Sequence, residues 1–205
     1  MTFRTYMRQE NIMNDTKNEN IKLLIVKQHR KSISIKIRNS SLIEVHAPFG
    51  IEDKDIDAFV EKHGDWINAK LAEMKEAESA LNSIDVASKA EFDEKIELAK
   101  KIIPEKCAYY ADMIGVDYGR ITLKAQKTLF GSCSAAGNLN FNIALMFAPE
   151  KVLDYVIIHE LCHLKEMNHS MDFWHEVEKV MKDYKVERQW LKDNGAIIMR
   201  KAGIM

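Results

Sequence analysis

The segment from Pro149 to Trp174 constrains the fold more than any other part of the chain. It contains His159, Glu160 and His163 in an H-E-x-x-H pattern. Residues four apart lie on one face of an α-helix, one turn above each other, so both imidazoles point at one place. Glu160 is turned to the side of that place, within reach of a water bound there. The pattern therefore predicts a helix that carries a metal site.

The rest of the segment predicts the same helix. Pro149 suits a first helical position, and Glu150 complements the positive end of the helix dipole. Asn168 is a suitable left-handed cap, and Ser170 a suitable N-cap for the next helix. Apolar residues recur at steps of three and four: Val152, Leu153, Val156, Ile157, Leu161, Leu164 and Met167. A helix this apolar is buried on most sides, so polar side chains in its middle need partners, and a metal ion is one.

The turn after the helix brings a third histidine, His169, back toward the motif. Zinc takes neutral imidazole readily, and catalytic zinc sites keep three protein ligands and one open position. We therefore predict a Zn²⁺ site formed by His159, His163 and His169. The competitors for the third position are His175, Glu166 and Asp172. The alternative interpretation is that the histidines are hydrogen-bonded core residues without a metal.

Composition limits the class of protein. The chain has 205 residues, of which 46% are hydrophobic, and a net charge of −1. This balance disfavours a globally basic nucleic-acid-binding protein. No apolar run is long enough to cross a membrane, and the first twenty residues lack the apolar core of a signal peptide. Three cysteines without a close pair favour free thiols in the cytoplasm.

The chain reads as a single domain over residues 21–195. Its first part, 21–82, contains strands and a helix, and its second part, 88–195, is the catalytic core. We expect a disordered polar N-terminus over residues 1–20 and a frayed tail over residues 196–205.

Alternating apolar residues predict antiparallel strands between residues 21 and 47. Six basic residues and no acid lie between Lys22 and Arg38. They indicate either a nucleic-acid or nucleotide partner, or a solvated sheet face whose charges discourage edge pairing.

Helical patterns follow at residues 53–81 and 88–114, the second with a capping-box spacing at Ser88 and Glu91. Residues 121–125 and 139–143 alternate again, with a turn at 136–138, and predict a small antiparallel sheet just before the histidine-bearing helix. Such a sheet can hold an extended peptide by strand addition. We interpret Cys133 as part of a tight turn of small residues. The fold class is therefore α+β.

Several stretches together resemble the YgjP-like metallopeptidase family, which is related to the WLM and SprT-type zincins. They are His159–His163, Asn168-His169, Phe173-Trp174, Gly131–Ser134, Gly137, Asn142, Ala148-Pro149 and Trp66-Ile67. The resemblance spans roughly residues 20–195. It implies a zincin-like fold, zinc on His159, His163 and His169, and Glu160 as catalytic acid and base. The family has an Arg-Trp pair where this chain has Leu129-Phe130.

The function expected is hydrolysis of a peptide or protein substrate by zinc-activated water, with Glu160 as general base. The donors considered for the developing oxyanion are His175, Tyr155, Tyr184 and Arg188. Three alternatives stay open: hydrolysis of a nucleotide phosphoanhydride, a SprT-like protease associated with nucleic acid, and a structural zinc module without activity.

Overall fold

The structure, a computed structural model, describes residues 4–9 and 21–205. Its internal contacts divide the chain into two compact units, residues 1–80 and 81–205. The division expected from the sequence inside one domain lies between residues 82 and 88, close to this boundary. That the two units form one domain stays a prediction.

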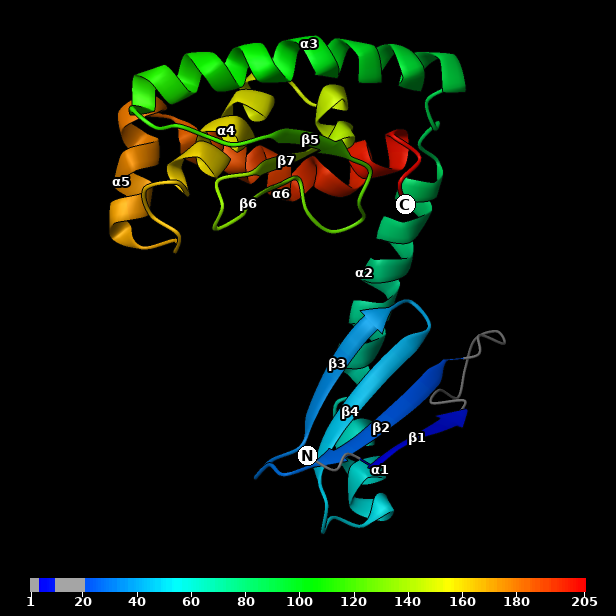
Figure 1. Ribbon diagram of the computed structural model, residues 1–205. Coiled ribbons are helices and arrows are strands. Elements are labelled where there is room, and N and C mark those ends of the chain that lie inside the picture. Colours follow the sequence, from blue (N-terminus) through cyan, green and yellow to red (C-terminus); the bar gives the residue numbers. More distant parts are fainter. Residues whose placement is uncertain (1–3, 10–20) are drawn as a thin grey trace. The chain divides into compact units, whose positions relative to one another are not determined.

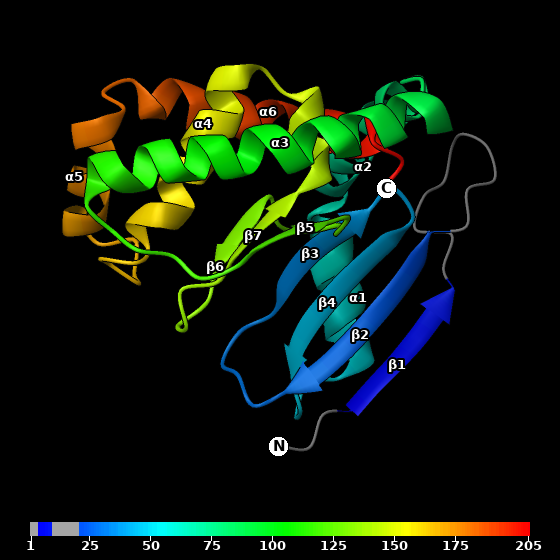
Figure 2. The ribbon, with the colours of Figure 1, turned by 45° about the horizontal axis from the view of Figure 1, so that its top comes forward.

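The N-terminal unit is a four-stranded sheet with helices on one face (Figures 1 and 2). The strand order is β1-β2-β4-β3. Its elements are β1 (Arg4–Gln9), β2 (Lys22–Gln28), β3 (Ser34–Asn39), β4 (Leu42–Pro48), α1 (Asp53–Lys62) and α2 (Gly64–Asn82).

Alternation along β2 and β4 builds the core of this unit. Every second side chain is buried, and the same face meets apolar residues of α1 and α2. The residues are Leu23, Ile25, Ile43, Val45, Ala47, Ile56, Val60, Ile67 and Leu71. Strand β3 has no fully buried residue and lies at the sheet edge.

Two expectations for this unit are wrong in part. All strands are expected to be antiparallel, but β2 and β4 run parallel. Strand β4 lies between β2 and β3 and pairs antiparallel with β3. Residues 4–9 are not disordered, since they form strand β1 against β2. The remainder of the predicted disordered segment, residues 1–3 and 10–20, lies outside the described residues.

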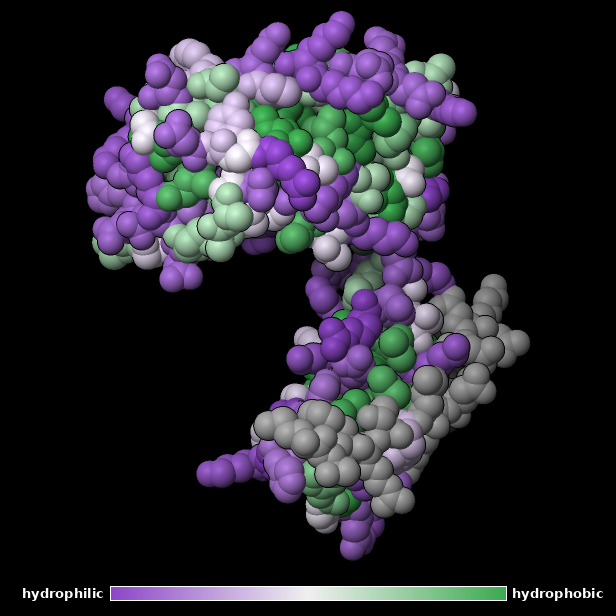
Figure 3. All heavy atoms as spheres, in the orientation of Figure 1, coloured by the Kyte–Doolittle hydropathy of each residue, from purple (hydrophilic) through white to green (hydrophobic). Residues whose placement is uncertain are grey.

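The second unit packs helices against a three-stranded sheet of order β5-β7-β6 (Figure 1). Its long helix α3 packs along α4, and its outer surface is hydrophilic (Figure 3). The elements are α3 (Lys89–Ile114), β5 (Ile121–Lys124), β6 (Gly131–Cys133), β7 (Leu139–Asn142), the 3-10 helix η1 (Ile143–Phe147), α4 (Glu150–Cys162), α5 (Met171–Val180) and α6 (Tyr184–Lys201).

Local sequence signals explain the helix ends. The Ser88 hydroxyl accepts a hydrogen bond from the Glu91 amide, and Ser170 caps α5 in the same way through the Phe173 amide. Gly115 ends α3 at a φ of 76°, a left-handed conformation that glycine adopts at low cost. The turn predicted at 136–138 is present, with Gly137 at a φ of 72°.

Three details of this unit differ from the sequence analysis. Strand β5 pairs parallel with β7, so the small sheet is mixed, and Cys133 ends strand β6 rather than sitting in a turn. Helix α4 ends at Cys162, before the predicted cap Asn168. The frayed tail expected over residues 196–205 is wrong, because α6 runs to Lys201 and three apolar side chains near its end are buried: Ile198, Met199 and Ile204.

Candidate metal centre

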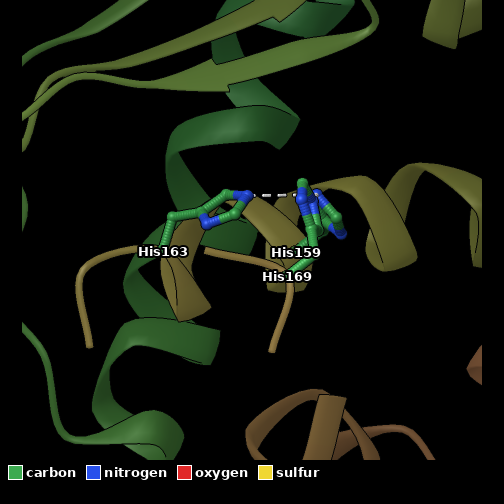
Figure 4. A group of neighbouring side chains, drawn as sticks. All are labelled: His159, His163 and His169. Carbon is green, nitrogen blue, oxygen red and sulfur yellow. Dashed lines mark hydrogen bonds between the residues drawn. The ribbon is translucent and has the colours of Figure 1, made fainter. Parts of the chain in front are cut away.

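Three histidine side chains converge at the end of α4 (Figure 4). The Nε2 atom of His159 lies 3.2 Å from Nε2 of His163 and 3.0 Å from Nε2 of His169. His163 follows the last residue of α4 in helical conformation, so it stays one turn from His159. His169 comes from the loop between α4 and α5.

The geometry fits a single zinc ion. Two nitrogens that bind one tetrahedral zinc at about 2.0–2.1 Å lie about 3.3 Å apart. The separations of 3.0 and 3.2 Å are close to that value. His175, Glu166 and Asp172, the competitors for the third position, are not part of this group of side chains.

The tautomer of His163 and the neutral state of the other two rings favour metal binding. His163 Nδ1 lies 3.0 Å from the Glu166 carbonyl oxygen and donates to it, which leaves the lone pair of Nε2 directed at the shared point. Burial, together with the other two histidines and Arg188, lowers the pKa of His159 to about 3. Burial also lowers the pKa of His169. Both rings are therefore neutral at physiological pH, the form that binds a metal.

Aromatic side chains at the start of α5 hold the three rings. The ring centroid of Phe173, which is fully buried, lies 4.5 to 4.9 Å from all three imidazoles and stacks on His163. Trp174 stacks on His169 at 5.6 Å. From the sequence, these two residues contribute to the family resemblance and to helix packing, and no role beside the histidines is assigned to them. Their position, four and five residues after the third histidine, is the available signal.

Glu160 lies beside the histidines in a dry environment. Its side chain is 5% exposed, and burial raises its pKa to about 8, against the opposing effect of a hydrogen bond from the Cys133 backbone amide. A β-carbon at Gly131 would lie 2.5 Å from Glu160 Oε1, so only glycine leaves room for this carboxyl. The role of strand β6 in placing Glu160 has no signal in the local sequence, because it depends on contacts between distant residues.

Of the other residues considered for catalysis, Tyr155 alone lines the cavity beside His159 and Glu160. Tyr184 stacks on Trp174, and the Arg188 guanidinium lies 4.5 Å from the Trp174 ring. His175 is exposed. Burial raises the pKa of the Cys133 thiol, so this thiol is protonated and a poor nucleophile.

The basic strands belong to the other unit, where ion pairs satisfy part of their charge. Lys27 pairs with Asp53, and Arg38 pairs with Glu44. These pairs fit the interpretation of a solvated sheet face.

A sequence model of the YgjP-like metallopeptidase domain matches residues 31–98 and 91–194. The chain belongs to the YgjP-like family. It is a metallopeptidase-family domain of the α+β class, and membership implies a divalent metal, typically zinc. The resemblance seen in the sequence is therefore confirmed.

Two solved structures of metallopeptidase zymogens are similar to part of this YgjP-like chain. Abylysin from Pyrococcus abyssi is 25% identical, with 45% of this chain and 94% of that chain covered and a TM-score of 0.41. Jannalysin from Methanocaldococcus jannaschii is 22% identical, with 44% and 96% covered and a TM-score of 0.39. No curated protein matches the chain. Within the described residues, no helix is long and apolar enough to span a membrane.

Proposed function

We propose that this protein is a zinc metallopeptidase in which His159, His163 and His169 hold the ion and Glu160 is the catalytic acid and base. The observation that carries the proposal is the convergence of three Nε2 atoms beside a buried carboxyl group. Zinc at this point supplies Lewis acidity, which polarises a carbonyl group and makes water easier to deprotonate.

Glu160 moves the proton in this scheme. As carboxylate it takes a proton from the attacking water, and it then passes this proton to the leaving amine. A pKa near the working pH suits a group that must both accept and release a proton. In the chain without metal, burial raises the pKa of Glu160 toward that range. The Cys133 amide holds the carboxyl in place.

Strand β6 is the surface on which the peptide is expected to bind. It is an edge strand that pairs only with β7 within its sheet, and its first residue contacts Glu160. An extended peptide that adds to this edge would carry its backbone past Glu160. Tyr155 lines the adjacent cavity, and because burial raises its pKa to about 12, its hydroxyl keeps a proton that it can donate to an oxyanion.

The test is the Glu160→Gln variant. We expect it to bind zinc like the wild type and to lose peptide hydrolysis by roughly 10²–10⁴-fold, the usual contribution of a general base. Glu166→Gln is the matched control, because Glu166 binds His163 through its backbone carbonyl and its carboxyl is not part of the histidine cluster. The assay uses a peptide library and a nucleotide panel, each with and without a chelator. Turnover retained in Glu160→Gln, or chelator-sensitive turnover of nucleotides alone, would contradict the proposal.

A further inference from the structure

A cavity of about 160 Å³ opens beside the proposed catalytic residues. His159 and Glu160 contribute to its lining on one side. The rest of the lining comes from Phe130 and Gly131 at the start of β6, from Tyr155 and Val156 on α4, and from Leu191 on α6. The cavity therefore combines an apolar wall with the group that carries the proposed chemistry.

The size and lining of the cavity define what it can take. An apolar protein cavity of about 150 Å³ binds benzene. A cavity of similar volume walled by Phe130, Val156 and Leu191 suits one large aliphatic or aromatic side chain. An acidic side chain would be disfavoured, because it would lie beside the buried Glu160 carboxyl.

The ring of Phe130 packs closely against α6 at Gly195. A β-carbon built on Gly195 would lie 2.9 Å from Phe130 Cζ and 3.0 Å from its Cε2. Gly195 is buried within α6, where glycine otherwise lowers helix stability. The ring of Phe130 thus occupies space that any other residue at position 195 would take.

On this basis, which rests on the proposed peptidase function, we propose that the cavity receives the substrate side chain beside the scissile bond, with Phe130, positioned by Gly195, limiting its size. Phe130 is the specificity-determining residue, and Gly195 is its positioning residue. The preferred substrate is a peptide with an aromatic or large aliphatic residue at that position.

The experiment displaces the Phe130 ring by a substitution at Gly195, so that Phe130 itself is unchanged. Gly195→Ala places a methyl group within 3.0 Å of two atoms of the Phe130 ring, so the ring, which lines the cavity, must shift. Gly64→Ala is the matched control, since a β-carbon at Gly64 meets nothing within 4 Å. Two readouts are taken on the full-length protein: toluene affinity from amide shifts of Gly131 and Leu191 in NMR spectra, and the ratio of kcat/KM for peptides with Phe against Ala at the variable position.

Wild type and Gly64→Ala are expected to bind toluene equally, and Gly195→Ala several-fold more weakly. The Phe-to-Ala ratio should fall in Gly195→Ala by roughly tenfold or more, the scale on which an apolar pocket discriminates size. Phe130→Ala, which opens the cavity, should raise the relative rate with a Trp peptide. This variant keeps the test decisive if Gly195→Ala does not fold.

The two proposals fail in different ways. If toluene affinity and peptide preference are the same in Gly195→Ala as in wild type, or unchanged in Phe130→Ala where the first variant does not fold, the size limit is overturned. If no variant cleaves any peptide while toluene affinity still depends on Gly195, the peptidase function falls and the role of Phe130 at the cavity stands.

Discussion

Glu160 and its neighbours show how single residues build the site. The carboxyl is buried next to three imidazoles, and strand β6 makes room for it at Gly131 and donates an amide hydrogen from Cys133. A carboxyl group in such a place is costly when charged unless a cation lies near. The three Nε2 atoms mark the place for that cation.

Gly131→Ala should displace the Glu160 carboxyl while leaving the three histidines unchanged. The added methyl group would lie 2.5 Å from Glu160 Oε1 and must displace the carboxyl. We expect a loss of about 1–3 kcal/mol in the free energy of unfolding, typical of overpacking, and strongly reduced hydrolysis. Chemical denaturation and the peptide assay measure both. Gly50→Ala, where a β-carbon meets nothing within 4 Å, should change neither.

In the metal-free protein, the pKa of Glu160 makes stability depend on pH. Burial raises this pKa from 4.5 to about 8 in the folded chain. Between these values the unfolded chain releases the proton and the folded chain keeps it, so the free energy of unfolding falls as the pH rises and is level above pH 8.

Glu160→Gln removes this effect. At pH 7 the metal-free variant should be more stable than metal-free wild type by roughly 2–4 kcal/mol, since one pKa unit corresponds to about 1.4 kcal/mol. The difference should vanish near pH 4, because Glu160 of the wild type is then protonated in both the folded and the unfolded chain. Urea unfolding across this pH range measures it, and a difference independent of pH would refute the assigned pKa.

Residue patterns allowed the three histidines and Glu160 to be selected from the sequence. The H-E-x-x-H spacing brings His159 and His163 onto one helical face, and the turn after α4 brings His169 back to them. Sequence patterns did not identify the partners that hold them. Gly131 and Phe130 act through contacts with residues 29 and 65 positions away, Glu160 and Gly195, which no local period records.

At the scale of elements, strand order and chain ends were the least predictable features. Alternation identifies which residues of β2 and β4 face the core, but the same alternation fits parallel and antiparallel partners. The last residues of a chain are often poorly ordered, so fraying is expected at the end of α6, whereas Ile198 and Met199 are buried against the core of the second unit. Packing with distant residues, not local propensity, keeps its last turns folded.

Adjacent isoleucines near the end of α6 test this packing. Ile198 is 3% exposed, and Ile197 is 39% exposed. Ile198→Ala should lower the free energy of unfolding by about 2–5 kcal/mol, the usual cost of truncating a buried side chain. Ile197→Ala makes the same chemical change on the exposed face and should cost less than about 1 kcal/mol. Equal effects in thermal or chemical denaturation would mean that the end of α6 is not packed as described.

At the scale of the whole molecule, the family match extends over both units, from residue 31 to residue 194. All residues proposed to bind zinc or move protons lie in the second unit, together with the cavity that Phe130 lines. The N-terminal unit contributes a basic sheet whose charges are partly neutralised by Asp53 and Glu44. The cytoplasmic location expected from the free cysteines stays a prediction.

The most direct test of the metal centre is X-ray absorption spectroscopy of the zinc-loaded full-length protein. We predict a spectrum fitted by three imidazole nitrogens and one further light atom at about 2.0–2.1 Å, with no sulfur at about 2.3 Å. The His163→Ala variant should lose stoichiometric zinc. A sulfur ligand, or fewer than three imidazoles in the wild-type spectrum, would contradict a centre formed by His159, His163 and His169.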